Sequence, residues 1–260
     1  MIDYSFSMAE LEYFLLVVIR VTCCFVTAPF FSMNNTPRRV KVGLGIFTAY
    51  LIYQATLPHD PVEYNTVLGY AVIIMKEAIV GLLIGFGASI CNTIVLYAGR
   101  FVDMEIGLAM ASQMDPTTNQ DASITGVYFQ YMVMLLLLVS GMHRYLLRAL
   151  AETYTLIPVN GAVFRQDALL ASFIQFMSDY LNIGFRISLP IFCVSLIVNV
   201  VLGILAKTSP QMNMFAVGMQ IKVLVGLCVL FFTTAMLPYI SDFVYTEMKT
   251  MIVRFVESMM

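Results

Sequence analysis

The chain has 260 residues, of which 60% are hydrophobic and 12% are charged, and its formal net charge is -2. Soluble domains carry about 25% charged residues, so this composition predicts an integral membrane protein. Lysine and arginine together number 14 and are scattered along the chain, which excludes the clustered basic surface that nucleic-acid binding requires.

Six apolar segments follow one another along the chain. A membrane-spanning helix needs about 20 residues, so most of the six qualify, but one is short and six segments need not mean six crossings. Prolines fall mostly at or near the segment ends, where a helix loses little by losing an N–H donor. The sequence therefore predicts an all-α integral membrane protein. The segments are residues 11–33, 40–57, 68–98, 127–142, 183–206 and 215–237.

The first apolar segment contains a charged residue, Arg20, near its middle. An arginine at membrane depth must face protein or a water-filled cavity and must find an acceptor. We expect Glu77, near one end of the third segment, to be that partner. A buried structural pair is the favoured interpretation, and contact with a substrate or an ion is the functional alternative.

Charges between the segments give conflicting signals about membrane orientation. The turn after the first segment holds Arg38, Arg39 and Lys41, so the positive-inside rule places this turn inside and the N-terminus outside. Strict alternation then places Arg100 inside, but it also places the basic residues of 142–179 outside, against the rule. We therefore expect a non-canonical topology rather than a simple serpentine bundle.

Small residues mark one face of the third segment. Gly81, Gly85 and Gly87 lie close together in IVGLLIGFGAS, and the spacing Gly81-x-x-x-Gly85 lets the backbone of another helix approach closely. This pattern predicts tight helix packing, either within the chain or against a partner.

Residues 99–116, with the sequence GRFVDMEIGLAMASQMDP, are too polar to face lipid. Arg100, Asp103 and Glu105 would each cost about 2.5 to 3.5 kcal/mol at the centre of a bilayer. We therefore expect this backbone to lie in protein, in water or along a pore.

An apolar face predicts that the stretch begins as a helix packed inward, while its charged residues stay on the polar side. Asp115 followed by Pro116 ends that helix, and the polar residues 117–121 predict a loop. Methionines just before the loop suit a surface that closes on itself and later around varied chains, and ordinary packing is the alternative. The apolar face consists of Met104, Gly107, Leu108 and Ala111.

The segment 142–179 mixes charged and apolar residues. It predicts partly amphipathic helices joined by a turn at residues 158–161. We place the boundary between two halves of the chain near the end of this segment.

Motifs for catalysis, cofactors and metals are absent from the sequence. The five cysteines lie in apolar segments without CxxC or Cys/His spacing, which predicts small buried hydrophobic residues. There is no GxxxxGK[ST] P-loop for ATP. Within residues 99–116, Asp103 and Glu105 are the only acids close in sequence, and two residues apart on a helix they point away from one another. We therefore do not expect an intramembrane enzyme, a cofactor or a metal site.

The chain carries an arginine-bearing first segment, a TAP turn followed by an RVK turn, a stretch from Gly-Leu to Asp-Pro, and an SPQ hairpin turn. These features lie in LLVVIRVTCCFVTAPFFSMNNTPRRVKVGLGIF, EAIVGLLIGFG, AGRFVDMEIGLAMASQMDP, GMHRYLLRAL and LPIFCVSLIVNVVLGILAKTSPQMNMFAVGMQIKVLVGL. Across these passages, and over nearly its whole length, the chain resembles the FliR/SctT family of export-gate proteins of type III secretion.

The resemblance implies a FliP-like helical body in residues 1–180, followed by a FliQ-like helical hairpin and C-terminal helix in residues 181–260. It implies a subunit of the flagellar export gate, through which unfolded flagellar proteins cross the bacterial inner membrane at the basal body. FliP and FliQ are the implied gate partners, and FlhB and FlhA are further partners. Export substrates and membrane lipid are the other expected contacts, with no nucleic acid and no cofactor.

The resemblance also implies that residues 107–116 form a plug that narrows the closed channel. Arg100 stands where relatives often carry a glutamate, and Asp103 supplies an acid one turn later. A transporter of small molecules or ions, acting through charges at membrane depth, is the alternative hypothesis. The plug residues are Leu108, Met110, Gln113 and Met114, and the charges are Arg20, Glu77, Arg100, Asp103 and Glu105.

Overall fold

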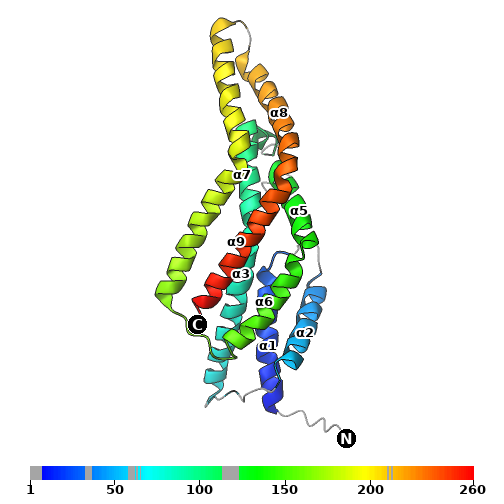
Figure 1. The fold of residues 1–260 in the computed structure, drawn as a ribbon, viewed down its shortest axis with the longest axis vertical. Helices are drawn as coiled ribbons and strands as arrows, with labels where there is room; N and C mark the ends of the chain where they lie inside the picture. The colour runs from blue at the N-terminus through cyan, green and yellow to red at the C-terminus, as the bar shows by residue number, and fades with distance from the viewer. Residues whose placement is uncertain are drawn as a thin grey trace. The chain divides into compact units, whose positions relative to one another are not determined.

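The computed structural model describes residues 8–32, 37–57, 62, 64, 66–112, 123–209, 211 and 213–260, without the side chains of 90–92, 111, 112, 214 and 215. Within this part of the chain every regular element is a helix, as Figure 1 shows, so the all-α prediction is confirmed. The elements are α1 (Met8–Thr27), α2 (Arg38–Ala55), α3 (Val67–Ile106), α4 (Ala109–Ser112), α5 (Ile124–Val139), α6 (Met142–Leu156), α7 (Gln166–Thr208), α8 (Met214–Thr233), the 3₁₀ turn η1 (Thr234–Met236) and α9 (Leu237–Glu257).

Two helices are longer than the apolar segments predict. Helix α3 continues past residue 98 to Ile106, into the polar stretch, and α7 starts before its apolar segment and contains Pro190 in its interior. The expectation that prolines punctuate the ends of helices is therefore wrong at Pro190. Helices in an apolar environment tolerate such a proline because neighbouring groups can satisfy the carbonyl that it leaves free.

The mixed segment 142–179 contains the predicted helices and the predicted turn. Helix α6 is amphipathic, because it buries Leu146 and Leu150 and exposes Arg148. The turn at residues 158–161 follows, with a backbone hydrogen bond of 2.8 Å from Gly161 N to Pro158 O. No helix boundary lies near residue 180, since α7 passes through it without a break.

The chain divides into two compact units, neither of which is continuous in sequence. The first unit comprises Met1–Ile90, Gly141–Phe176 and Thr246–Met260, and the second comprises Cys91–Ser140 and Met177–Tyr245. The predicted division into residues 1–180 and 181–260 concerns which part of the chain is FliP-like and which is FliQ-like. The compact units do not test that division, so it stays a prediction.

The first unit is held together where helices approach without intervening side chains. A Cβ atom at Gly81 would collide with the carbonyl oxygen of Arg20, and one at Gly85 would collide with Thr27 of the same helix, α1. The predicted small-residue face therefore packs within the chain. Gly87 lies instead against α9, where a Cβ would stand 3.0 Å from the ring of Phe255.

The second unit uses the same device. A Cβ at Gly99 of α3 would collide with the backbone of Gly126 in α5, and a Cβ at Gly226 of α8 would lie 2.6 Å from the side chain of Ile106. Val102, Ile106 and Ile191 form a buried cluster from α3 and α7. The end of α3 is therefore fixed on three sides, by α5, α7 and α8.

Three stretches of the described chain are long and apolar enough to cross a membrane, namely Val67–Ile106, Gln166–Thr208 and Ala216–Glu257. The bent pair α5 and α6 would make a fourth if it counts as one crossing. Helices α1 and α2 are not among them, and each carries three charged residues. This agrees with the expectation that six apolar segments need not mean six crossings.

Cysteine burial follows the exposure of the helices. Cys24 in α1 is buried as predicted, whereas Cys193 in α7 and Cys228 in α8 are exposed, which corrects that prediction. Both lie on helices whose apolar side chains are largely exposed in the isolated chain. The side chain of Cys91 lies outside the described part.

The glycine contact between α1 and α3 makes a direct prediction. Changing Gly81→Ala should lower the free energy of unfolding by about 1–3 kcal/mol, because the new methyl group meets backbone that cannot move aside. Thermal unfolding of the detergent-solubilised protein measures the effect. Gly43→Ala is the matched control in α2, because a Cβ there meets no atom within 4 Å. Equal midpoints for the two variants would contradict the close approach.

Candidate functional site

The candidate site surrounds the end of α3, where polar residues interrupt the apolar helices. Helix α3 ends at Ile106 because Gly107 has a φ of +93°, in the left-handed region that favours glycine. The Gly107 N–H donates to Asp103 O at 3.0 Å, and the Met110 N–H donates to Gly107 O at 3.3 Å. The short helix α4 follows. The predicted break at Asp115 and Pro116 lies outside the described residues.

The buried face of this stretch differs from the predicted one. Met104, expected to pack inward, is 70% exposed, while Asp103, expected to stay polar, is only 3% exposed. The buried side consists of Val102, Asp103 and Ile106. Apolar spacing misidentified the face because the carboxylate of Asp103 finds hydrogen-bond donors inside the protein.

Asp103 accepts three hydrogen bonds from the beginning of α5. Ser123 Oγ donates to Asp103 Oδ2 at 2.7 Å, and the Thr125 N–H lies 3.3 Å from both carboxylate oxygens. Ser123 also caps α5 in the usual way, since its Oγ accepts from the Gly126 N–H at 2.8 Å. The buried charge is therefore satisfied by a helix N-terminus, where negative charge is stabilised.

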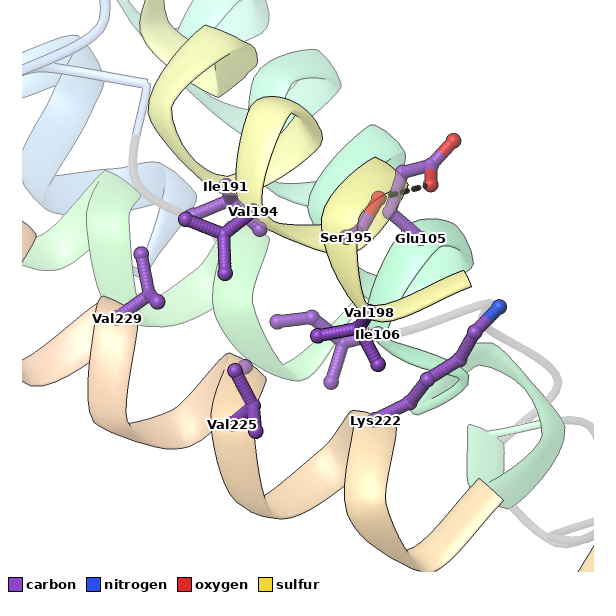
Figure 2. Close-up of a pocket in the computed structure, with 10 residues that line it drawn as sticks. Glu105, Ile106, Ile191, Val194, Ser195, Val198, Lys222, Val225 and Val229 are labelled. Atoms are coloured by element: carbon purple, nitrogen blue, oxygen red, sulfur yellow. Dashed lines mark hydrogen bonds between the residues drawn. The ribbon is translucent and has the colours of Figure 1, made fainter. Parts of the chain in front are cut away.

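Glu105 points away from Asp103 and contacts a different helix. Its Oε2 accepts a hydrogen bond of 2.7 Å from Ser195 Oγ of α7, drawn as the dashed line in Figure 2. The cavity beside this pair is about 10 Å³, bordered by apolar side chains of α7 and α8 and by Lys222. That volume is about enough for one water molecule, so the cavity holds no larger ligand.

Two of the four predicted plug residues are described, and each lines a groove of about 340 Å³. Met110, 50% exposed, borders a groove with Met104, Met219 and Lys222. Leu108 borders another groove whose walls come from α5 and α8. Leu108 and Met110 therefore border two open grooves, so a small movement of the backbone after Gly107 would change the shape of both grooves. Gln113 and Met114 lie outside the described residues.

Arg20 and Glu77 form the predicted ion pair in the first unit. Arg20 Nε donates to Glu77 Oε2 at 2.5 Å, and both side chains are 0% exposed. Arg20 Nη1 donates to the backbone oxygen of Ile157 at 2.9 Å, and Glu77 Oε1 accepts from the Asn160 N–H at 3.0 Å. The pair thus joins α1 and α3 to the turn that follows α6.

Further contacts complete the surroundings of the Arg20 guanidinium. Its carbon lies 4.2 Å from the ring centroid of Tyr154, within cation–π range. Tyr154 in turn donates through its hydroxyl to the backbone oxygen of Val17 at 3.2 Å. Among the described residues, only Arg20 Nη2 of this guanidinium has no hydrogen-bond partner. This arrangement matches a structural pair and leaves no route to solvent for either charge.

The five predicted intramembrane charges thus fall into separate places. Arg20 pairs with Glu77, Asp103 and Glu105 bind serines of different helices, and Arg100 is exposed on α3. The structure brings Arg20 and Glu77 together but gathers no larger cluster of these charges. Among the described residues, no group of three or more His, Cys, Asp or Glu is arranged to hold a metal ion.

Sequence reasoning missed the residues that complete these contacts. Ser123 carried a usable signal, because a serine before an apolar helical segment is typical of an N-cap. Ser195 and Tyr154 carried none, since each is an ordinary residue of an apolar or amphipathic helix whose partner is far away in sequence.

Comparisons with known proteins agree over most of the chain. A family model described as bacterial export proteins, family 1, matches residues 11–248. The flagellar biosynthetic protein FliR of Bacillus subtilis (strain 168) is 30% identical over 219 residues, which cover 84% of each chain. FliR of Escherichia coli (strain K12) is 27% identical over 227 residues, covering 87% of this chain and 84% of the relative. FliR of Buchnera aphidicola subsp. Schizaphis graminum (strain Sg) is 26% identical over 242 residues, covering 92% and 93%.

The buried pair gives a prediction about stability. Arg20→Leu should cost roughly 3–5 kcal/mol, because it leaves the buried Glu77 carboxylate without its partner. The double variant with Glu77→Gln should cost less than the sum of the two single changes, which a double-mutant cycle of thermal unfolding measures. The exposed pair Arg148 and Glu152 is the control and should show little coupling. Additive effects at the buried pair would mean that the two charges do not interact.

Proposed function

This chain belongs to the bacterial export proteins of family 1, and we propose that it forms part of the channel through which unfolded flagellar proteins cross the inner membrane. The family resemblance drawn from the sequence motifs is confirmed by these matches. The chain is a membrane subunit of the flagellar export apparatus. The channel role, the basal body as its site and the inner membrane as its location are the proposed parts.

The observation that carries the channel role is the position of Leu108 and Met110 directly after Gly107, at the borders of two open grooves. Leu108 and Met110 each line an open groove of about 340 Å³, directly after a helix end that is held by buried contacts. Methionine is unbranched and polarizable, so it can fill irregular space without binding one partner tightly. A seal that must yield to many different polypeptides needs these properties.

Partners follow from the apolar surface of α7 and α8. Their side chains are exposed over several turns, as at Ile197 (63%), Val200 (63%) and Phe231 (77%). Apolar surface of this extent marks contact with lipid or with other proteins. We propose FliP and FliQ as neighbours in the gate, with FlhB and FlhA as further partners, and lipid over the remaining surface.

The proposed role includes no catalysis. Asp103 and Glu105 are engaged by different serines and do not face a common substrate position. A pair of acids that exchange protons with one substrate would have to do so. We propose that transport is energised by partners and by the proton-motive force.

The comparisons do not favour a small-molecule or ion transporter, which was the alternative hypothesis. The contacts agree, because the charges that a transporter would use are occupied by protein groups. Arg20 and Glu77 are fully buried against each other, and the cavity beside Glu105 is the size of one water molecule. Ion uptake by the chain alone in liposomes would reopen that alternative.

Assembly provides the first test of the proposed function. Expressed alone, the chain should be unstable or should self-associate, because its exposed apolar faces cannot be covered within one chain. Co-expression with FliP and FliQ should raise its yield and give a complex that co-purifies. Mass spectrometry identifies the co-purified chains. A stable, detergent-solubilised monomer that unfolds cooperatively and binds neither FliP nor FliQ would contradict the proposal.

The seal provides the second test. Deletion of residues 108–112, or truncation of Met110 and Met114 to alanine, should leave assembly intact and make the membrane permeable to small ions. Conductance of the purified complex, and the sensitivity of growing cells to small solutes, measure the leak. Met75→Ala is the matched control, because Met75 is 64% exposed on α3 and lines neither groove. An assembled deletion variant that stays as tight as the parent would assign the seal to another subunit.

A further inference from the structure

Asp103 stands where the chain leaves α3 and where it returns at the start of α5. The Gly107 N–H, at which the chain leaves, donates to the backbone oxygen of Asp103. Ser123, at which the chain returns, donates to the Asp103 carboxylate across a separation of 20 residues. The first of these bonds is the ordinary backbone bond of a helix's last turn, so only the contact between the carboxylate and Ser123 depends on the residue type at position 103.

The Asp103 carboxylate accepts a hydrogen bond from α5 in addition to the one that the N-cap, Ser123, accepts. The first amides of a helix lack partners within the helix, and in α5 they are divided between two acceptors. The Gly126 N–H goes to the N-cap, Ser123, and the Thr125 N–H goes to Asp103. Because Ser123 already caps α5, the contribution of Asp103 is to fix the place of this helix start beside α3.

The neighbouring backbone contact restricts that place further. Gly99 of α3 lies against Gly126 of α5 with no room for a Cβ atom between them. The side chains of Asp103, Ser123 and Thr125 are all at most 5% exposed. A buried carboxylate that lost its donors would be strongly destabilised, so the helix start cannot easily shift while the charge remains.

We propose that Asp103 is a positioning residue, which together with Ser123 and the Thr125 N–H forms a clamp that fixes the start of α5 beside Leu108. This proposal rests on the proposed function, in which Leu108 belongs to the seal that narrows the channel. Asp103 itself touches no exported chain and acts through the backbone that it holds. Opening the clamp frees the start of α5 without removing any side chain of the seal.

The test uses the assembled complex and two readouts. In Asp103→Ala, the Thr125 amide should exchange its hydrogen roughly tenfold faster or more, because a hydrogen bond to a charged group is worth at least about that factor in an opening equilibrium. The same complex should leak small ions above the parent level. Asp103→Asn keeps the shape and one acceptor oxygen, so we expect intermediate exchange and an intermediate leak.

Ser195→Ala is the matched control. It removes a bond between a serine hydroxyl and a carboxylate of the same length, 2.7 Å, from the same end of α3, at the partly buried Glu105. It connects α3 to α7 rather than to the returning chain. We expect it to change neither the exchange of the Thr125 amide nor the leak.

The other outcomes decide against the proposal. Faster exchange without a leak would make Asp103 a helix cap and no more, and a leak without faster exchange would show that the clamp does not act through α5. If Asp103→Ala fails to assemble, Asp103→Asn decides by the same two readouts. A leak from the deletion of 108–112 but from neither Asp103 variant would overturn the clamp and leave the channel role standing. If the deletion is also tight, the clamp and the seal are both wrong.

Discussion

Burial of charge among apolar helices is the constraint on which the rest of this structure depends. An isolated charge in such surroundings is too costly to persist, so each buried charge must find its partners in a distant part of the chain. Arg20 obtains a carboxylate from α3 and carbonyl oxygens near the end of α6. Asp103 obtains a hydroxyl and an amide from α5. These polar contacts fix which helices are neighbours, a choice that apolar packing alone leaves open.

Glycines make these polar contacts geometrically possible. Gly81 and Gly85 bring α3 against α1 close to the ion pair, and Gly99 brings α3 against α5 close to Asp103. A Cβ at any of these positions would collide with an atom of the neighbouring helix and would push the two helices apart. The small-residue face and the buried charge are thus parts of one device, which occurs once in each compact unit. Because these buried charges find partners within the chain, each unit can expose apolar side chains on its outside.

The sequence predicts a contact best where a buried group has few possible partners. Arg20 lies in the middle of an apolar sequence segment and Glu77 is a carboxylate near one end of another, so their pairing follows from the cost of leaving either charge buried alone. The buried face at the end of α3 was misassigned at Met104, because the donors that bury Asp103 come from Ser123 and Thr125, which are separated from it by a loop. The length of α7 was also missed, because its first turns are too polar to register as an apolar segment. Contacts between residues far apart in the sequence decide which face of a helix is buried and where a helix begins, and the local spacing of apolar residues does not predict these contacts.

The composition of the first unit has a consequence for how the protein is made. Phe255 and Met251 are fully buried in that unit, and the backbone of Val163 binds Met259. Phe86 meets Phe255 with a ring-centroid separation of 6.1 Å. The core of this unit therefore cannot close until the ribosome has synthesised every residue of the other unit. During that interval the nascent helices have apolar faces without their final neighbours, and the membrane must hold them until the last-made helix arrives.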